Sequence, residues 1–102
     1  MPQVLQTETF RDWLAGLRDR RAVVRVVARV ARLAQGNLGD VKPVGGGLSE
    51  TRIDYGPGYR LYFASKGKAL IVLLAGGDKA TQAKDIKAAK ALWEAWKEEN
   101  DD

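Results

Sequence analysis

The chain has 102 residues, with 17 Lys and Arg against 13 Asp and Glu and a net charge of +4, so we expect a single small domain over residues 1–102. It contains no cysteine and no histidine, which excludes disulfides, thiolate metal sites and the usual general base near neutral pH. Because it has neither an apolar run long enough to span a membrane nor a signal-peptide pattern, we expect a cytoplasmic protein without a membrane partner.

The first third of the chain is predicted to be a short extended piece at residues 3–6 and a helical hairpin. Thr7 is a typical N-cap for a helix that runs to about Arg18. Residues 20–33 are rich in valine, but their arginines recur at spacings of four, four and three, which places them on one face of a second helix. These arginines are Arg21, Arg25, Arg29 and Arg32. We expect the opposite, apolar stripe to consist of Val23, Val26, Val27, Val30 and Leu33, and the helix to end at Gly36 and Asn37.

The rest of the chain is predicted to be strands followed by one helix. Residues 41–44 are predicted to be a short extended piece, and residues 48–55 and 59–65 read as strands with a type II turn over residues 56–59. The apolar residues 69–75 are typical of a central strand covered on both faces. We expect Gly76 and Gly77 to end that strand and Thr81 to cap a helix that reaches about Glu98. The apolar face of this helix is predicted to hold Ile86, Ala89, Trp93 and Trp96.

These elements predict an α+β domain with the order β-α-α-β-β-β-α. In it, an antiparallel sheet of three or four strands packs against the helical hairpin and the C-terminal helix.

The positive charge lies in the body of the chain. Five of the acids but only one base fall within residues 94–102, so the first 93 residues carry a net charge of +8. All nine arginines lie at or before Arg60. A compact body this basic favours a polyanionic partner, nucleic acid more than a membrane surface; the alternative is a basic but ordinary surface.

Three stretches of the sequence carry a resemblance to a known family. They are GNLGDVK at 36–42, RIDYGPGYRLYF at 52–63 and LLAGGDKATQ at 73–82. Together they resemble the HigB-type "addiction module killer" branch of the RelE/ParE toxin superfamily, and the resemblance covers nearly the whole chain. It implies a small RelE-like domain whose fold has the element order predicted above.

The resemblance also implies a function and a reaction. The chain would be the toxin of a type II toxin–antitoxin system, an endoribonuclease that cuts messenger RNA in the A site of the 70S ribosome and arrests translation. Its partner would be a cognate antitoxin, a small helix-turn-helix protein. In toxins of this kind the 2′-hydroxyl attacks the adjacent phosphate, so the site needs positive charge on the phosphate oxygens, and no metal or cofactor is expected.

Catalytic roles are carried over by position in the matching stretches. Arg60 would clamp the scissile phosphate, Lys79 would stabilise the phosphorane or the leaving oxygen, and Arg52 would contact phosphate or assist the base. Two structural alternatives stay open: a salt bridge from Arg60 to Asp54 or Glu50, and a solvated Lys79. No tyrosine follows Lys79, as one does in the best-studied branch, so the general acid and base are not identified.

Further residues are expected to contact RNA without taking part in the chemistry. Lys42 would follow the RNA backbone, Tyr59 would stack on a base, and Gln82 would orient a base or a proton. Tyr62 lies on the other face of the same predicted strand as Tyr59, so only one of the two can line the site. The remaining expected contacts are the helical arginines Arg21, Arg25 and Arg29.

Two other functions remain open at this stage. One is a non-enzymatic, ParE-like inhibitor of DNA gyrase on the same fold, which would not need the cluster of Arg52, Arg60 and Lys79. The other is a small DNA-binding module that uses the arginine face of the second helix. That face offers almost no Asn, Gln or Ser to read base edges, which suits phosphates or ribosomal RNA better.

Overall fold

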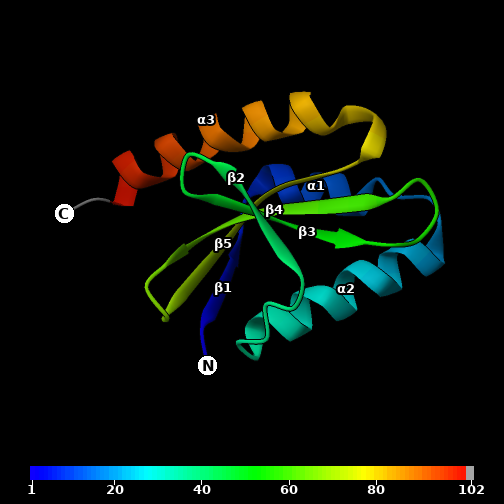
Figure 1. Cartoon of the computed structure of the whole chain (residues 1–102), viewed down its shortest axis with the longest axis horizontal. Coiled ribbons are helices and arrows are strands. Elements are labelled where there is room, and N and C mark those ends of the chain that lie inside the picture. The colour runs from blue at the N-terminus through cyan, green and yellow to red at the C-terminus, as the bar shows by residue number, and fades with distance from the viewer. Residues whose placement is uncertain (101–102) are drawn as a thin grey trace.

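The computed structural model describes residues 1–100, and Figure 1 shows how their helices and strands are arranged. In chain order the elements are β1 (Gln3–Gln6), α1 (Glu8–Ala15), α2 (Arg20–Ala34), β2 (Val41–Gly45), β3 (Leu48–Ile53), β4 (Tyr59–Lys66), β5 (Leu70–Asp78), the 3-10 turn η1 (Lys79–Thr81) and α3 (Gln82–Asn100).

The five strands form one mixed sheet in the order β1-β5-β4-β3-β2. β1 runs parallel to β5, and every other pair is antiparallel. The predicted α+β class is confirmed, and β4 pairs with both β3 and β5 as expected. The sheet has more strands than were predicted, because residues 41–45 pair with β3 and the N-terminal extended piece joins the far edge of the sheet.

The helices cover the sheet from both sides. α1 and α2 pack on one face, where Phe10, Val26 and Leu33 join Leu61 and Phe63 of β4 in one core cluster. α3 crosses the other face, along the top of Figure 1, and its Ala89 and Trp93 belong to a second cluster. Since side chains alternate along a strand, β4 supplies both clusters and separates them.

Side-chain caps begin the first two helices, and the cap at Thr7 was predicted from the sequence. The Thr7 hydroxyl accepts the backbone N–H of Phe10 at 3.1 Å and donates to the Leu74 carbonyl at 2.7 Å, which fastens the start of α1 to β5. Asp19 caps α2 by accepting the N–H of Arg21 at 2.9 Å. The helix assignment of residues 20–33 is confirmed, although α1 ends at Ala15, earlier than the predicted Arg18.

One member of the predicted apolar stripe of α2 is placed wrongly. Val26 and Leu33 are buried, but Val27 is 52% exposed. It lies one residue, or about 100°, beyond Val26 on the helix, so the two side chains cannot face the sheet together. Arg29, expected on the open arginine face, is instead partly buried and contacts β3.

Gly76 and Gly77 do not end β5, which continues through both to Asp78. Their role is close packing: a β-carbon on Gly76 would overlap the ring of Trp13 on the α1 side, and one on Gly77 would overlap the carboxylate of Asp85 on the α3 side. The prediction of Thr81 as the cap of α3 is also wrong. Asp78 caps the intervening turn by accepting the N–H of Ala80 at 2.9 Å, and α3 begins at Gln82.

The turn between β3 and β4 closes one residue earlier than predicted. The N–H of Gly58 donates to the carbonyl of Tyr55 at 3.0 Å, and Gly56 has a positive φ of 56°. β3 therefore ends at Ile53, two residues before the predicted end. This turn borders the groove described next.

Candidate functional site

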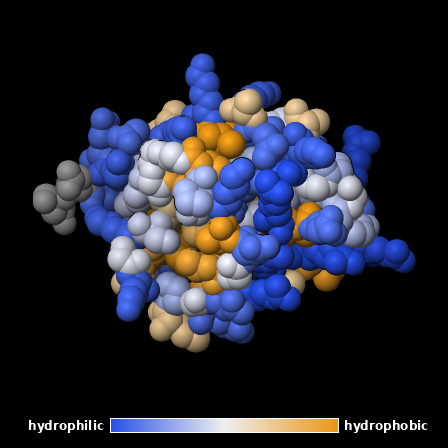
Figure 2. All heavy atoms as spheres, in the orientation of Figure 1, coloured by the Kyte–Doolittle hydropathy of each residue, from blue (hydrophilic) through white to orange (hydrophobic). Residues whose placement is uncertain are grey.

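A basic groove lies where β2, β3 and the start of β4 meet the end of β5. Figure 2 shows strongly hydrophilic residues over the middle and right of this face of the molecule. The groove holds five bases and three acids, and so carries net positive charge. Its lining residues are Arg29, Asp40, Val41, Lys42, Glu50, Arg52, Ile53, Asp54, Gly56, Pro57, Gly58, Tyr59, Arg60 and Lys79.

The centre of the groove is a buried carboxylate between two arginines. Arg52 of β3 and Arg60 of β4 are directly opposite each other in the strand register, an arrangement that is destabilising for like charges alone. Glu50, only 2% exposed, relieves it: its Oε1 accepts from Arg60 Nε at 3.0 Å and from Arg52 Nε at 3.2 Å. The three side chains share one face of the sheet because they alternate along their strands.

The two arginines differ in how freely they can reach a ligand. Arg60 is buried, 6% exposed, and its Nη1 also donates to the carbonyl of Gly58 at 2.7 Å. The Arg52 side chain is 56% exposed, and the structure shows a bond only from its Nε. Arg60 is therefore held by the protein on two nitrogens, whereas the Arg52 guanidinium keeps its outer edge open to the groove.

Gly58 makes the position of Arg60 possible. Its φ is +80°, in the region that favours glycine, and a β-carbon there would lie 3.1 Å from Arg60 Nη1. The Gly-Pro-Gly turn thus serves the site directly.

The turn after β5 and the first residue of α3 reach the groove at Lys79 and at Glu50. Gln82 donates through Nε2 to Glu50 Oε1 at 3.5 Å, a long contact. Lys79 is exposed in the turn before α3 and lines the groove. Asp85 lies against the backbone of Gly77 and accepts the hydroxyl of Thr81. These polar groups lie together because β5 runs past its glycines before the chain turns into α3.

Tyr62 lies directly across the strand pair from Glu50. Its ring is fully buried on the α3 face, and its hydroxyl has no hydrogen-bond partner. Burial, and then the negative charges of Glu50 and Asp85, raise its pKa to about 12. The phenol therefore stays protonated at neutral pH and is a poor acid.

The predicted site residues divide between the groove and other places. Arg52, Arg60, Lys79, Lys42 and Arg29 all line the groove, and Gln82 reaches its carboxylate. Of the two structural alternatives for Arg60, the salt bridge to Glu50 is present. Tyr59 also belongs to the groove lining, but it is only 9% exposed, and its ring packs in the core on the α1 face, edge-on to Trp13 at 6.2 Å. A buried ring of this kind is poorly placed to stack on a base. This agrees with the prediction that Tyr59 and Tyr62 point to opposite faces.

The three arginines of α2 that were predicted to contact RNA lie in different environments. Arg29 donates to the hydroxyl of Thr51 and, at 2.7 Å, to the carbonyl of Arg52, and its burial lowers its pKa. Arg21 and Arg25 lie outside the groove. Arg25 rests on the ring of Tyr55, 4.6 Å from its centroid.

Glu50 is the groove residue that sequence reasoning valued too little, treating it only as a partner for Arg60. The signal available was its place between Leu48 and Arg52 in a strand with period two: an acid on the inner face of a sheet is unusual unless it is paired. What the sequence alone could not supply was the register that brings Arg60 to it.

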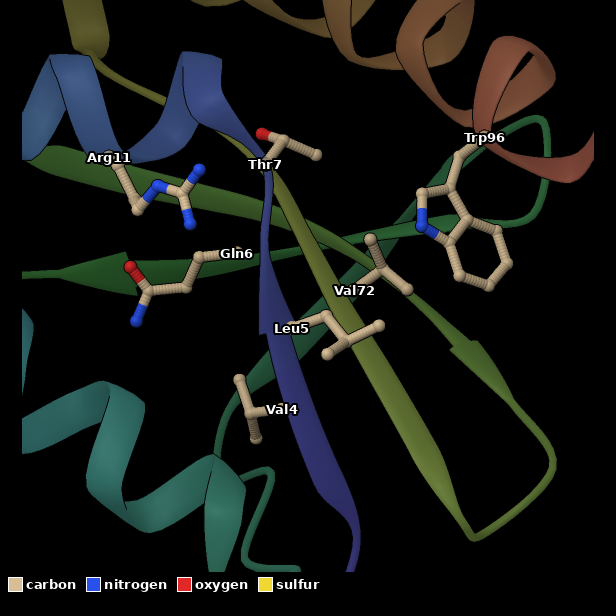
Figure 3. A pocket seen from close by; sticks show the side chains of 7 residues that line it. All are labelled: Val4, Leu5, Gln6, Thr7, Arg11, Val72 and Trp96. Atoms are coloured by element: carbon tan, nitrogen blue, oxygen red, sulfur yellow. The ribbon is translucent and has the colours of Figure 1, made fainter. Parts of the chain in front are cut away.

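A second hollow lies at the β1 edge of the sheet, between α1 and the end of α3. Figure 3 shows Val4 and Leu5 of β1, Val72 of β5 and Trp96 of α3 around it, with Arg11 as its charged residue. It holds no carboxylate and no second cation. Its lining therefore offers fewer charged groups for binding or catalysis than the groove does.

Within residues 1–100, no three acidic side chains lie close enough to hold a metal ion. None of the helices in that range is long and apolar enough to cross a membrane.

Comparison with known proteins gives one clear relative. No protein-family model matches the sequence. A protein of Haemophilus influenzae, described as uncharacterized, is 50% identical over 90 residues, which are 88% of this chain and 91% of that protein. Identity at this level over nearly the full length of both chains shows common descent and a common fold. The chain belongs to the same family as this Haemophilus influenzae protein.

Proposed function

We propose that the chain is the toxin of a toxin–antitoxin pair of the RelE/HigB kind, an endoribonuclease that cuts messenger RNA on the ribosome and is neutralised by a cognate antitoxin. The order of helices and strands and the net basic groove support this. The observation that carries it is the buried Glu50 carboxylate, held between Arg52 and Arg60 in a groove that also offers exposed Lys42 and Lys79.

The geometry of Glu50 suits a general base. The hydrogen bonds that it accepts from the described residues all reach Oε1. Oε2 is therefore the oxygen left for a substrate hydroxyl. In the reaction that we propose, this carboxylate takes the proton of the 2′-hydroxyl as the 2′-oxygen attacks the phosphorus, which forms a cyclic phosphate. In a chain without histidine, a carboxylate can take this role.

The positively charged side chains of the groove take the other roles in the proposed reaction. With two nitrogens bound to Glu50 and Gly58, Arg60 fixes the carboxylate and adds positive charge, and does not offer the two-pronged clamp that the sequence suggested. The open guanidinium edge of Arg52 takes the phosphate oxygens as negative charge builds up on them. Lys79, exposed on the far side of Glu50, donates the proton that the leaving 5′-oxygen requires.

Binding of the RNA strand is assigned to the outer parts of the groove. Lys42 on the edge strand β2 and Arg29 of α2 both line the groove and provide positive charge there. We do not assign stacking to Tyr59, because its ring is in the core.

A cleavage assay on purified ribosomes, programmed with a defined messenger RNA, tests the proposal. We expect products with a 2′,3′-cyclic phosphate and a 5′-hydroxyl, and no cleavage when the nucleotide at the cut carries a 2′-deoxy sugar. Cleavage that persists on the deoxy substrate contradicts the reaction. If induction of the protein stops DNA synthesis while messenger RNA stays intact, the gyrase-inhibitor alternative replaces it.

A further inference from the structure

Exposed apolar side chains are concentrated on one turn of α2. In the part of the chain that the structure describes, three large hydrophobic side chains are exposed: Met1 at the terminus, Val24 at 67% and Val27 at 52%. Valine contributes little to helix propensity and is stabilising chiefly when buried. Alanine or lysine at these two positions would therefore stabilise the isolated helix better than valine does.

The two valines belong to a longer stripe. Val24, Val27, Ala28 and Ala31 have the spacing i, i+3, i+4, i+7, and all four are exposed. The core side of the helix carries Ala22, Val26 and Leu33, so the stripe faces away from the sheet. We call these four residues the outer face of α2.

Arginines border this outer face along one side. Arg21, Arg25 and Arg32 are all exposed, share the adjacent row of the helix and make no ion pair within the described chain. The helix itself contains no acidic residue. Arg25 is partly fixed by the ring of Tyr55, whose hydroxyl donates to Asp19 at 2.8 Å. On the other side, the half-buried Val23 and Val30 lie between the stripe and the core.

This pattern favours one kind of occupant. A nucleic acid would use the arginines, but it would gain nothing from the exposed row of valine and alanine beside them. A second copy of α2 would bring one arginine row against another. An amphipathic helix with an apolar stripe and an acidic edge satisfies both halves of the surface, by burial of the valines and by pairing with the arginines.

We propose that the outer face of α2 is a docking surface for an acidic amphipathic helix of another protein. The proposal does not rest on RNA cleavage, because the surface lies on α2 outside the groove and shares with it only the neighbouring Arg29. It reassigns Arg21 and Arg25 from RNA to a protein partner.

The probe is a labelled synthetic helix of about 20 residues, with leucines at spacings of three and four and glutamates along one edge. Its controls are a scrambled peptide of the same composition and a peptide with lysine in place of glutamate. Fluorescence anisotropy is measured with the full chain at about 0.05 M and about 0.5 M salt. We expect binding to the acidic amphipathic peptide, weakened at the higher salt, and to neither control.

Variants separate the two halves of the surface. Val24→Ser with Val27→Ser should weaken peptide binding by about tenfold or more while leaving the melting temperature unchanged, since neither side chain is buried. Arg21→Ala with Arg25→Ala should weaken it mainly at low salt. The charge-matched control is Lys84→Ala with Lys87→Ala on α3, where both lysines are exposed, and it should bind as the parent does.

Three results overturn the proposal. The first is no binding, or equal binding by the double-serine variant. The second is displacement of the peptide by a single-stranded RNA oligonucleotide whose binding depends on the arginines but not on the valines. That result would make the surface a nucleic-acid site. The third is self-association in sedimentation experiments that the double-serine variant abolishes, which makes the occupant a second copy.

Discussion

The groove and the outer face of α2 are both rich in arginine, yet the side chains are held in different ways. In the groove, Arg52 and Arg60 both donate to one buried carboxylate, and Arg60 is itself buried. On α2, Arg21 and Arg32 are exposed beside apolar surface. Net positive charge therefore locates both surfaces but does not distinguish between them. The buried carboxylate of Glu50 does distinguish them, because it pairs with the arginines of the groove and has no counterpart on α2.

Loss of Arg60 should have the largest effect on stability. Arg60→Ala leaves Glu50 buried with one of its two arginines missing, and breaking a buried pair from one side costs about 3–5 kcal/mol. We expect a loss in that range in urea unfolding, and less than about 0.5 kcal/mol for the exposed Arg21→Ala control. A loss below about 1 kcal/mol for Arg60→Ala would show that Arg52 alone satisfies the carboxylate. Because of this cost, an alanine at position 60 tests folding and chemistry together.

The Gly-Pro-Gly turn should be more sensitive than other turns of the same backbone shape. Gly58 and Gly39 both have positive φ, but only at Gly58 would a β-carbon meet Arg60, whereas Gly39 has open space around it. We expect Gly39→Ala to cost about 1 kcal/mol from backbone strain, and Gly58→Ala to cost about 1–2 kcal/mol more. Equal losses in the two variants would mean that the turn does not position Arg60.

Tyr62 allows a pH test of the buried side of the groove. Its pKa in the folded protein, about 12, lies above the ordinary value of 10, so the protonated phenol is favoured by folding. That contribution is complete below about pH 10 and is lost as the pH rises towards 12. We expect unfolding by urea to need less denaturant across this interval, and Tyr62→Phe to remove that part of the pH dependence. The same variant should be neutral or more stable by up to about 1 kcal/mol at pH 7, because it deletes a buried hydroxyl without a partner. A clear loss of stability at pH 7 would contradict this placement of the hydroxyl.

The smallest effect is expected on α2 itself. Arg25→Ala removes an exposed guanidinium that lies over the half-buried ring of Tyr55, a contact worth about 0.5–1 kcal/mol. Thermal unfolding should hardly change, and the change should shrink further at high salt. A loss as large as that of Arg60→Ala would mean that the α2 arginines are part of the structural network and not a free surface.

The sequence was sufficient for the elements whose patterns are local. The four-residue spacing of the arginines identified α2 against its valine content, and Thr7 and the apolar run of β5 were interpreted correctly. The errors came from contacts between distant residues. Gly76 and Gly77 suggest a break, and only the packing of Trp13 and Asp85 against them shows why they lie within a strand.

The same limit applies to the site. Arg52, Arg60 and Lys79, which line the groove, could be named from the sequence, but the different roles that we propose for the two arginines could not. These roles depend on the strand register that places Arg52 opposite Arg60 and on the turn carbonyl of Gly58. Val27 shows that a local pattern can also mislead, because the helical spacing predicted it on the apolar stripe of α2 and the structure leaves it exposed.

The cleavage rate of Glu50→Gln on programmed ribosomes shows whether Glu50 is the general base. It is measured in single turnover at saturating protein, with Asp54→Asn as the matched control, because Asp54 lines the same groove but is exposed. If Glu50 takes the proton of the 2′-hydroxyl, its amide should cleave about 10²- to 10⁴-fold more slowly, while Asp54→Asn stays within about threefold of the parent. If a folded Glu50→Gln protein cleaves at the parent rate, Glu50 is not the general base.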